Sequence, residues 1–123
     1  MNLNKIKEDL KGLKKINDLG KNLEVVAFGS QVKGGERPNS DIDIAIITRI
    51  HNKEKNLQIL KSILPYNYNP YDVKIFELLP LRIKMSIIKD HIVVYGNELE
   101  LSEYFYHYRK LWMDSKHRII NQF

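Results

Sequence analysis

Apolar residues recur at two spacings along the chain, and the alternation between these spacings predicts alternating helices and strands. Near the N-terminus, Leu3, Ile6, Leu10 and Leu13 follow one another at steps of three and four residues, which places them on one face of a helix. Short runs rich in Val and Ile, bounded by Gly, Pro, Asn or Ser, are typical of strands. We expect helices over residues 3–18, 52–64, 80–90 and 99–118, and strands over residues 23–28, 41–48, 72–78 and 92–95.

The order of these elements predicts an α/β (α+β) fold, in which helices flank a small mixed sheet of about four strands. Only about a dozen residues join the first two strands, too few for a full crossover, so we expect this pair to be antiparallel. A helix joins the second strand to the third, which favours parallel pairing through a right-handed crossover. The second strand, DIDIAIIT, is apolar on both faces beyond its two acids, which indicates a position inside the sheet.

Length and composition narrow the class of protein. The chain has 123 residues, 43% of them hydrophobic, and is expected to form one domain over residues 1–123 with its core at about 23–96. The absence of cysteine excludes disulfides, a Cys-based zinc site and a thiol nucleophile. No apolar run approaches the ~20 residues that a membrane-spanning helix needs. The N-terminal segment lacks the apolar stretch of a signal peptide, so we expect a cytoplasmic protein.

The net charge of +5 has two explanations. A solvated, Lys-rich surface is one, and attraction to a polyanion such as a nucleotide phosphate is the other. The basic residues are spread along the chain and form no Arg-rich arm, so direct binding of nucleic acid is not expected.

Two aspartates open the second strand, in the pattern Asp41-Ile42-Asp43. Residues two apart on a strand point to the same face, about 6–7 Å apart along the backbone, so the two carboxylates repel each other. A divalent cation between them would remove that repulsion, and ligation by oxygen alone favours Mg²⁺ or Mn²⁺. Taken alone, the pattern is also compatible with solvated carboxylates at the end of a strand.

The Gly29–Ser30 pair follows the first strand directly. Backbone N–H groups at the start of a helical turn, with a hydroxyl beside them, suit phosphate oxygens, although a Gly-Ser turn that caps a helix has the same composition. Antiparallel pairing of the first two strands would bring this bend to the same end of the sheet as Asp41 and Asp43. In the loop that follows, Lys33 could contact a triphosphate or be an exposed cation, and the same holds for Arg37.

Asp72 begins the third strand, and parallel pairing would place it beside the start of the second. It could complete a cluster of three carboxylates, either as a metal ligand or as a base that takes a proton from an attacking hydroxyl. The alternative is a turn residue after Pro70. Glu77 is a rival acid, but its odd offset puts it on the opposite face of the expected strand from Asp72.

The predicted C-terminal helix contains five aromatic residues in nine positions, which either pack onto the domain or face a partner. The four histidines show no metal-binding spacing and are interpreted as structural or exposed. The aromatic residues are Tyr104, Phe105, Tyr106, Tyr108 and Trp112.

Gly-Ser, ten residues, Asp-x-Asp and a later Asp together resemble the DNA polymerase beta nucleotidyltransferase superfamily. The sequence segment GSQVKGGERPNSDIDIAI is most similar to the minimal nucleotidyltransferases (MNT), which are often the antitoxin half of an MNT/HEPN toxin–antitoxin pair. The resemblance covers roughly residues 23–96 and implies the nucleotidyltransferase fold. It also implies that Gly29 and Ser30 hold the nucleotide triphosphate. Two Mg²⁺ ions, with Mn²⁺ as the alternative, would be bound by Asp41, Asp43 and Asp72, with Asp72 nearest the attacking hydroxyl.

By this resemblance, the expected function is that of an antitoxin that transfers AMP from ATP to a tyrosine hydroxyl of a HEPN-type toxin encoded by a neighbouring gene. A nucleotidyltransferase that acts on a small molecule or an RNA end is a second hypothesis, although such acceptors usually need an additional binding domain. A third hypothesis is a non-catalytic module that binds the toxin through the aromatic helix. The three intact aspartates favour catalysis.

Overall fold

The computed structural model describes residues 2–15, 23–30, 32 and 41–121, and of residues 14, 15 and 117–121 it describes the backbone alone. It contains four α-helices, three short 3₁₀ helices and four strands within these residues. The α-helices are α1 (Leu3–Asp9), α2 (Lys53–Ile63), α3 (Leu81–Lys89) and α4 (Glu98–Asn121), the 3₁₀ helices are η1 (Lys11–Lys15), η3 (Leu64–Tyr66) and η4 (Phe76–Leu78), and the strands are β1 (Glu24–Phe28), β2 (Ile42–Ile47), β3 (Tyr71–Ile75) and β4 (His91–Tyr95).

The four strands form one mixed sheet in the order β3-β2-β1-β4. Strand β1 pairs antiparallel with both β2 and β4, whereas β2 and β3 are parallel. The predicted α+β fold and both predicted strand pairings are therefore confirmed, and β2 lies inside the sheet as its two apolar faces indicated.

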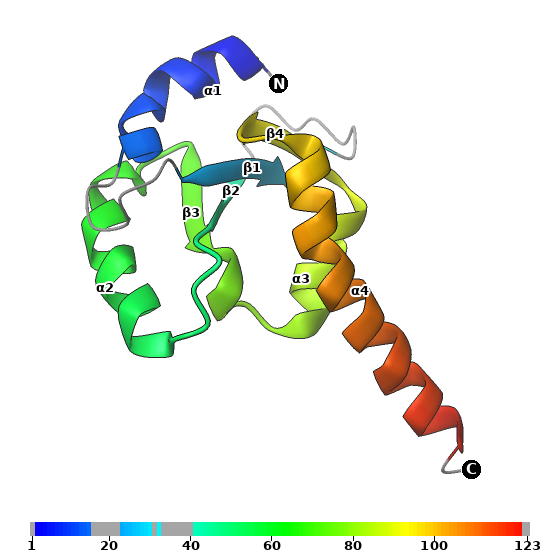
Figure 1. Ribbon diagram of the computed structural model, residues 1–123. Coiled ribbons are helices and arrows are strands. Elements are labelled where there is room, and N and C mark those ends of the chain that lie inside the picture. The colour runs from blue at the N-terminus through cyan, green and yellow to red at the C-terminus, as the bar shows by residue number, and fades with distance from the viewer. Residues whose placement is uncertain (1, 16–22, 31, 33–40, 122–123) are drawn as a thin grey trace.

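Helices cover both faces of the sheet (Figure 1). On β2, Ile44 and Ile46 pack under α1, η1 and α2, whereas Ala45 and Ile47 face α3 and α4. All four of these side chains are buried, with relative exposures of 0–2%. Asp43 has the same parity as Ala45, so the alternation of the strand places its side chain on the face covered by α3 and α4.

Local signals explain where α1 and α2 begin. The side chain of Asn2 accepts a hydrogen bond from the backbone N–H of Lys5 at 3.2 Å, and that of Asn52 accepts one from the backbone N–H of Lys55 at 3.0 Å. Such N-caps satisfy donors that the first turn of a helix leaves free. The first residues of α1 and α2 are therefore determined by the capping side chains of Asn2 and Asn52 rather than by the spacing of apolar residues.

Two elements differ from the prediction. The N-terminal α-helix ends at Asp9 and continues as η1, because Gly12 is a weak helix former and the Tyr66 ring packs where a side chain at position 12 would lie. Residues 16–18 of that predicted helix lie outside the described part of the chain. The third strand ends at Ile75, since Phe76 turns into the core and residues 76–78 form η4.

Helix α4 packs on the domain through its first half only. Leu101, Tyr104, Phe105 and Tyr108 are buried, whereas beyond them the helix runs past the other elements (Figure 1). Of the five aromatic residues in this helix, Tyr104, Phe105 and Tyr108 therefore pack onto the domain, which was one of the two predicted alternatives. Among the described residues, no helix combines the length and the apolarity that crossing a membrane requires.

Candidate active site

The parallel pairing of β2 and β3 brings Asp43 and Asp72 directly opposite each other. Both side chains are half-buried, and both point to the face of the sheet that carries α3 and α4. Asp41 is exposed and lies just before β2, with the same strand parity as Asp43. The three aspartates therefore lie at one end of the sheet, as predicted, and Asp43 and Asp72 are paired across neighbouring strands.

Negative charge accumulates at Asp43. Burial raises the pKa of the Asp43 carboxyl, the charge of Asp72 raises it further, and Asp41 adds a smaller effect in the same direction. Lys74 opposes these effects, and its Nζ atom lies 3.5 Å from Asp72 Oδ2. This ion pair is partly exposed and therefore weak, so one lysine leaves the repulsion between the carboxylates largely uncompensated.

The residues fit divalent cations by the chemistry of their donors. Carboxylate oxygens on neighbouring strands are the hard ligands that Mg²⁺ and Mn²⁺ prefer, and a cation would relieve the repulsion that raises the pKa of Asp43. Across residues 2–15, 23–30, 32 and 41–121, no three His, Cys, Asp or Glu side chains are already arranged as a metal-binding group. Binding would therefore need the aspartate side chains to turn towards a common point.

Gly29 lies directly against the Asp43 carboxylate. Its φ is +85°, a left-handed conformation that side chains disfavour, and a Cβ atom there would lie less than 3.0 Å from Asp43 Oδ2. The backbone turns immediately afterwards, where Val32 N–H donates to Gly29 O at 3.1 Å, and the exposed Ser30 occupies this turn. The bend and the aspartates therefore share one end of the sheet. Lys33 and Arg37 lie outside the described residues.

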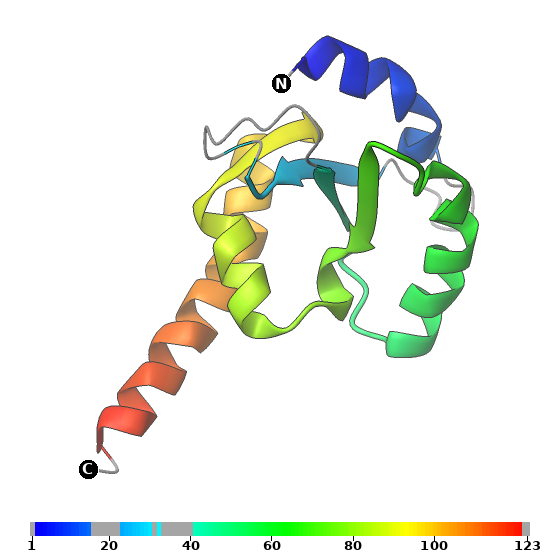
Figure 2. The same ribbon diagram turned by 180° about the vertical axis from the view of Figure 1, so that it is seen from behind.

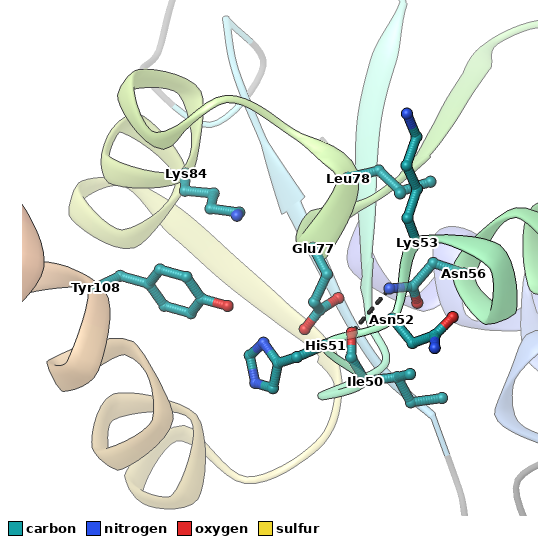
Figure 3. Close-up of a pocket in the computed structure, with 9 residues that line it drawn as sticks. All are labelled: Ile50, His51, Asn52, Lys53, Asn56, Glu77, Leu78, Lys84 and Tyr108. Carbon is teal, nitrogen blue, oxygen red and sulfur yellow. Dashed lines mark hydrogen bonds between the residues drawn. The ribbon is translucent and has the colours of Figure 1, made fainter.

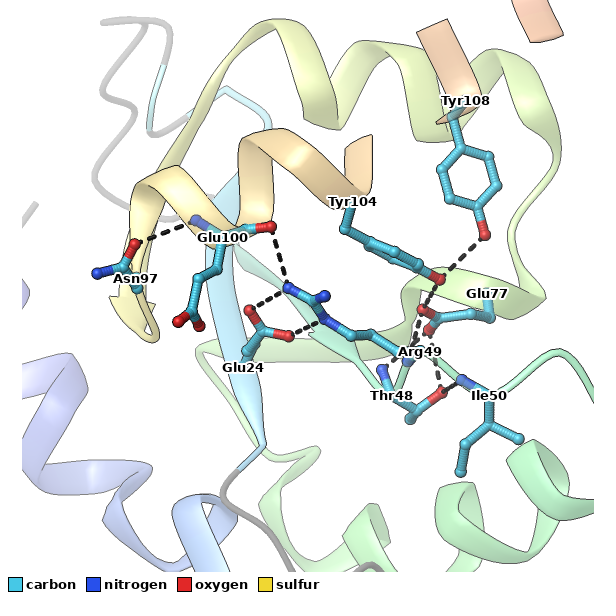
Figure 4. Close-up of polar contacts among 9 residues, drawn as sticks. All are labelled: Glu24, Thr48, Arg49, Ile50, Glu77, Asn97, Glu100, Tyr104 and Tyr108. Atoms are coloured by element: carbon cyan, nitrogen blue, oxygen red, sulfur yellow. Dashed lines mark hydrogen bonds and ion pairs between the residues drawn. The ribbon is translucent and has the colours of Figure 1, made fainter. Parts of the chain in front are cut away.

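Glu77, the rival acid, belongs to a different structure at the other end of β2 (Figure 4). Its Oε1 atom accepts hydrogen bonds from Thr48 N and Oγ1 at 3.0 and 3.2 Å, and its Oε2 atom accepts from Arg49 N at 2.9 Å and Tyr104 OH at 2.6 Å. The single hydroxyl proton of Thr48 is shared with Asn56 Oδ1 at 2.6 Å, and the other three donors bond to the Glu77 carboxylate. Burial, followed by the hydrogen bond to Glu77, raises the pKa of Tyr104, so Tyr104 stays protonated. Glu77 is thus a structural acceptor, and its position follows from η4 rather than from the face of a strand.

Sequence reasoning missed Arg49 and Lys74. Arg49 adopts φ +59° and makes a two-pronged ion pair with Glu24 at 2.6 and 3.0 Å, while its guanidinium also covers the Tyr104 ring at 4.8 Å from the centroid (Figure 4). No motif marks Arg49, because its partners come from three separate elements. Lys74 could have been found, since it lies two residues beyond Asp72 and hence on the same face of β3.

A cavity of about 420 Å³ lies beside Glu77, between the end of β2, α2, α3 and α4 (Figure 3). His51 and Lys84 line it, and Lys84 Nζ lies 4.9 Å from the centroid of the Tyr108 ring. Burial lowers the pKa of Lys84, although the charge of Glu77 opposes that effect. Because β2 and β3 carry their aspartates at the opposite end, this cavity is separate from the carboxylate site.

The histidines in the described residues are structural or exposed, as predicted. The His91 side chain is largely buried and contacts Ile87 O at 2.9 Å and Glu98 Oε1 at 3.0 Å. His51 and His107 are exposed, and nothing is described of the His117 side chain.

Known proteins resemble this chain in sequence and in fold. A relative from Methanocaldococcus jannaschii, named "Putative protein adenylyltransferase MJ1547", is 48% identical over 100 residues, which cover 80% of this chain and 77% of the relative. A solved structure of a toxin–antitoxin with AMP-PNP shares the fold, with a TM-score of 0.66 and 17% identity over 99% of this chain and 98% of that chain. A structure of the tri-AMPylated Shewanella oneidensis HEPN toxin in complex with MNT antitoxin also shares it, with a TM-score of 0.59 and 14% identity over 98% of this chain and 93% of that chain. The family model of the nucleotidyltransferase domain matches residues 3–94, which include nearly the whole sheet. This chain therefore belongs to the nucleotidyltransferase domain family.

Proposed function

We propose that this nucleotidyltransferase transfers AMP from ATP to a tyrosine hydroxyl of a HEPN-type toxin, and so acts as the antitoxin of the pair. The observation that carries the proposal is the in-register pair of Asp43 and Asp72, with the Asp43 carboxylate packed against the backbone of Gly29. The relative named as an adenylyltransferase supports AMP as the transferred group, and the AMPylated toxin among the fold neighbours supports a protein acceptor. The domain would comprise residues 1–123, with its core at about 23–96, and would act on ATP in the cytoplasm.

Each site residue has a role in this proposal. Asp41, Asp43 and Asp72 would hold two Mg²⁺ or Mn²⁺ ions, which supply positive charge to the phosphates when bound. The backbone of Gly29, with Ser30 and Lys33, would hold the triphosphate. Asp72 would orient the acceptor hydroxyl and receive its proton, as the hydroxyl oxygen bonds to the α-phosphorus and the bond to pyrophosphate breaks. The protein thus contributes positioning and compensation of charge.

The test is intact mass spectrometry of the HEPN-type protein encoded beside this gene, after incubation with the purified nucleotidyltransferase, ATP and Mg²⁺. We expect mass increases of whole AMP groups, which are abolished by a chelator and by Asp43→Asn. Asp114→Asn is the matched control, because Asp114 is an exposed aspartate on α4. AMP transfer by Asp43→Asn at the wild-type rate would refute the assignment of the site.

The same variant separates catalysis from simple binding of the toxin. If the protein neutralises its partner by AMP transfer, cells that carry the toxin should lose protection with Asp43→Asn and keep it with Asp114→Asn. Full protection by Asp43→Asn would instead identify a non-catalytic binding module. AMP found on an RNA end or a small molecule, with none on the toxin, would identify a different acceptor.

A further inference from the structure

A groove of about 620 Å³ lies between α3 and the middle of α4, where the two helices lie side by side before α4 runs past the rest of the domain (Figures 1 and 2). From α3, Arg82, Met85, Ser86 and Lys89 line the groove together with the buried Ile88, and Arg82 and Lys89 each lie three and four residues from the pair Met85–Ser86. Arg109, Trp112 and Met113 of α4 show the same spacing. Two facing helical stripes of this kind form the type of groove into which a third helix packs.

The groove exposes apolar surface where the domain no longer covers α4. Met113 is 65% exposed, and Trp112 is only half-buried, although Trp and Met are the side chains that most often anchor protein interfaces. A helix segment that projects from its domain is marginally stable in water without packing against another surface. The second half of α4 therefore presents a surface that a partner would stabilise.

The charge of the groove defines the partner. All the charged side chains among its described lining residues are basic, namely Arg82, Lys89 and Arg109. Helix α3 as a whole carries three basic residues and no acidic one, and Asp114 of α4 does not line the groove. Basic residues around an apolar floor complement a surface that is apolar at its centre and acidic at its edges. A phosphate backbone would use the basic residues and leave the apolar floor without a contact.

From these observations we propose that the α3–α4 groove binds an acidic amphipathic helix of a partner protein, with an apolar stripe against Trp112 and Met113 and carboxylates beside Arg82, Lys89 and Arg109. The groove is built from residues that take no part in the carboxylate site, so this binding does not depend on the proposed transfer of AMP.

Trp112 is the only tryptophan of the chain, so its fluorescence reports directly on the groove. The probe is a synthetic helical peptide with leucines at steps of three and four and glutamates on both flanks. One comparison peptide replaces its glutamates with lysines, and another replaces its leucines with serines. We expect a saturable change of the Trp112 emission with the glutamate–leucine peptide alone, and weaker binding at high salt.

Matched variants test the surface itself. Arg109→Glu should weaken binding about three- to tenfold, whereas Lys110→Glu, which reverses the adjacent charge outside the groove, should leave it unchanged. In the same way, Met113→Ser should weaken binding and Leu111→Ser, at another exposed apolar position of α4, should not. Circular dichroism of each variant verifies that the helices remain folded.

Three results would overturn the proposal. The first is equal binding of the lysine peptide, and the second is equal loss of binding in Arg109→Glu and Lys110→Glu. The third is a change of the Trp112 emission with a single-stranded oligonucleotide or an anionic lipid vesicle but with none of the peptides. That result would assign the basic groove to nucleic acid or to membrane lipid.

Discussion

Replacement of Gly29 by alanine tests the contact between the bend and the carboxylates. At φ +85°, a residue with a Cβ costs about 1–2 kcal/mol relative to glycine. The added methyl group would also lie less than 3.0 Å from Asp43 Oδ2 and 3.2 Å from its Cγ, so the carboxylate must rotate away or the strands must separate. We therefore expect a loss of about 1–2 kcal/mol in the free energy of unfolding, together with a displaced Asp43 carboxylate.

The two consequences are measured separately. Thermal unfolding with a chelator present should show a decrease in Tm of about 3–8 °C for a domain of this size. The rate of AMP transfer to the partner should fall about 100-fold or more, because a displacement of about 1 Å at a reacting site is enough for such a loss. Both measurements use the purified protein, and the transfer rate is expressed per folded molecule.

Gly96→Ala is the matched control. Gly96 also has a positive φ, +132°, but a Cβ atom there would make only ordinary contacts of 3.4–3.6 Å with Glu24 and Leu101. This variant should lose stability through backbone strain and keep its rate of transfer. If Gly29→Ala retained the wild-type rate, or if Gly96→Ala lost as much activity, the close approach of Gly29 to Asp43 would have no role in the reaction.

Three further predictions concern the two ends of β2. Because the folded protein raises the pKa of Asp43, its stability without metal should fall as pH rises through that raised pKa. Asp43→Asn should therefore have the higher Tm at pH 7, because it removes a half-buried charge and its repulsion from Asp72, and should lose that advantage near pH 3. Arg49→Lys should lower the free energy of unfolding by about 1–2 kcal/mol, measured by urea titration, because lysine cannot make the two-pronged contact with Glu24; an unchanged midpoint would contradict this. Glu77→Gln should cost about 2–3 kcal/mol, since an amide nitrogen would face hydrogen-bond donors, yet the rate of transfer per folded molecule should not change.

The sequence predicted the parts of the site that depend on strand order. The short connection before Asp41 and the helix before Asp72 determine which strands pair and in which direction, and the period of two then fixes the face of each aspartate. The apolar residues on both faces of β2 were likewise enough to place that strand inside the sheet.

What the sequence could not predict depends on the ends of elements and on contacts between distant residues. Nothing in the run of residues 72–78 shows that the strand ends at Ile75, because the turn at Phe76 is stabilised by burial under α3 and α4. The position of Glu77 follows from that turn, and the contacts of Arg49 follow from the tertiary fold. Hydrophobic periodicity describes one element at a time and cannot supply these contacts.

The hydrogen bonds that Glu77 accepts influence which substitutions this domain can tolerate during evolution. Strand β2 is held at its far end by the hydrogen bonds of Glu77, so residues outside the carboxylate site offset the repulsion among the acids at its near end. Natural variants at Glu77 or its hydrogen-bond donors would consequently reduce the amount of folded protein in the cell and leave each surviving molecule fully competent. Variants among the aspartates would do the reverse, and the two kinds of damage would be distinguishable by a measurement of protein abundance.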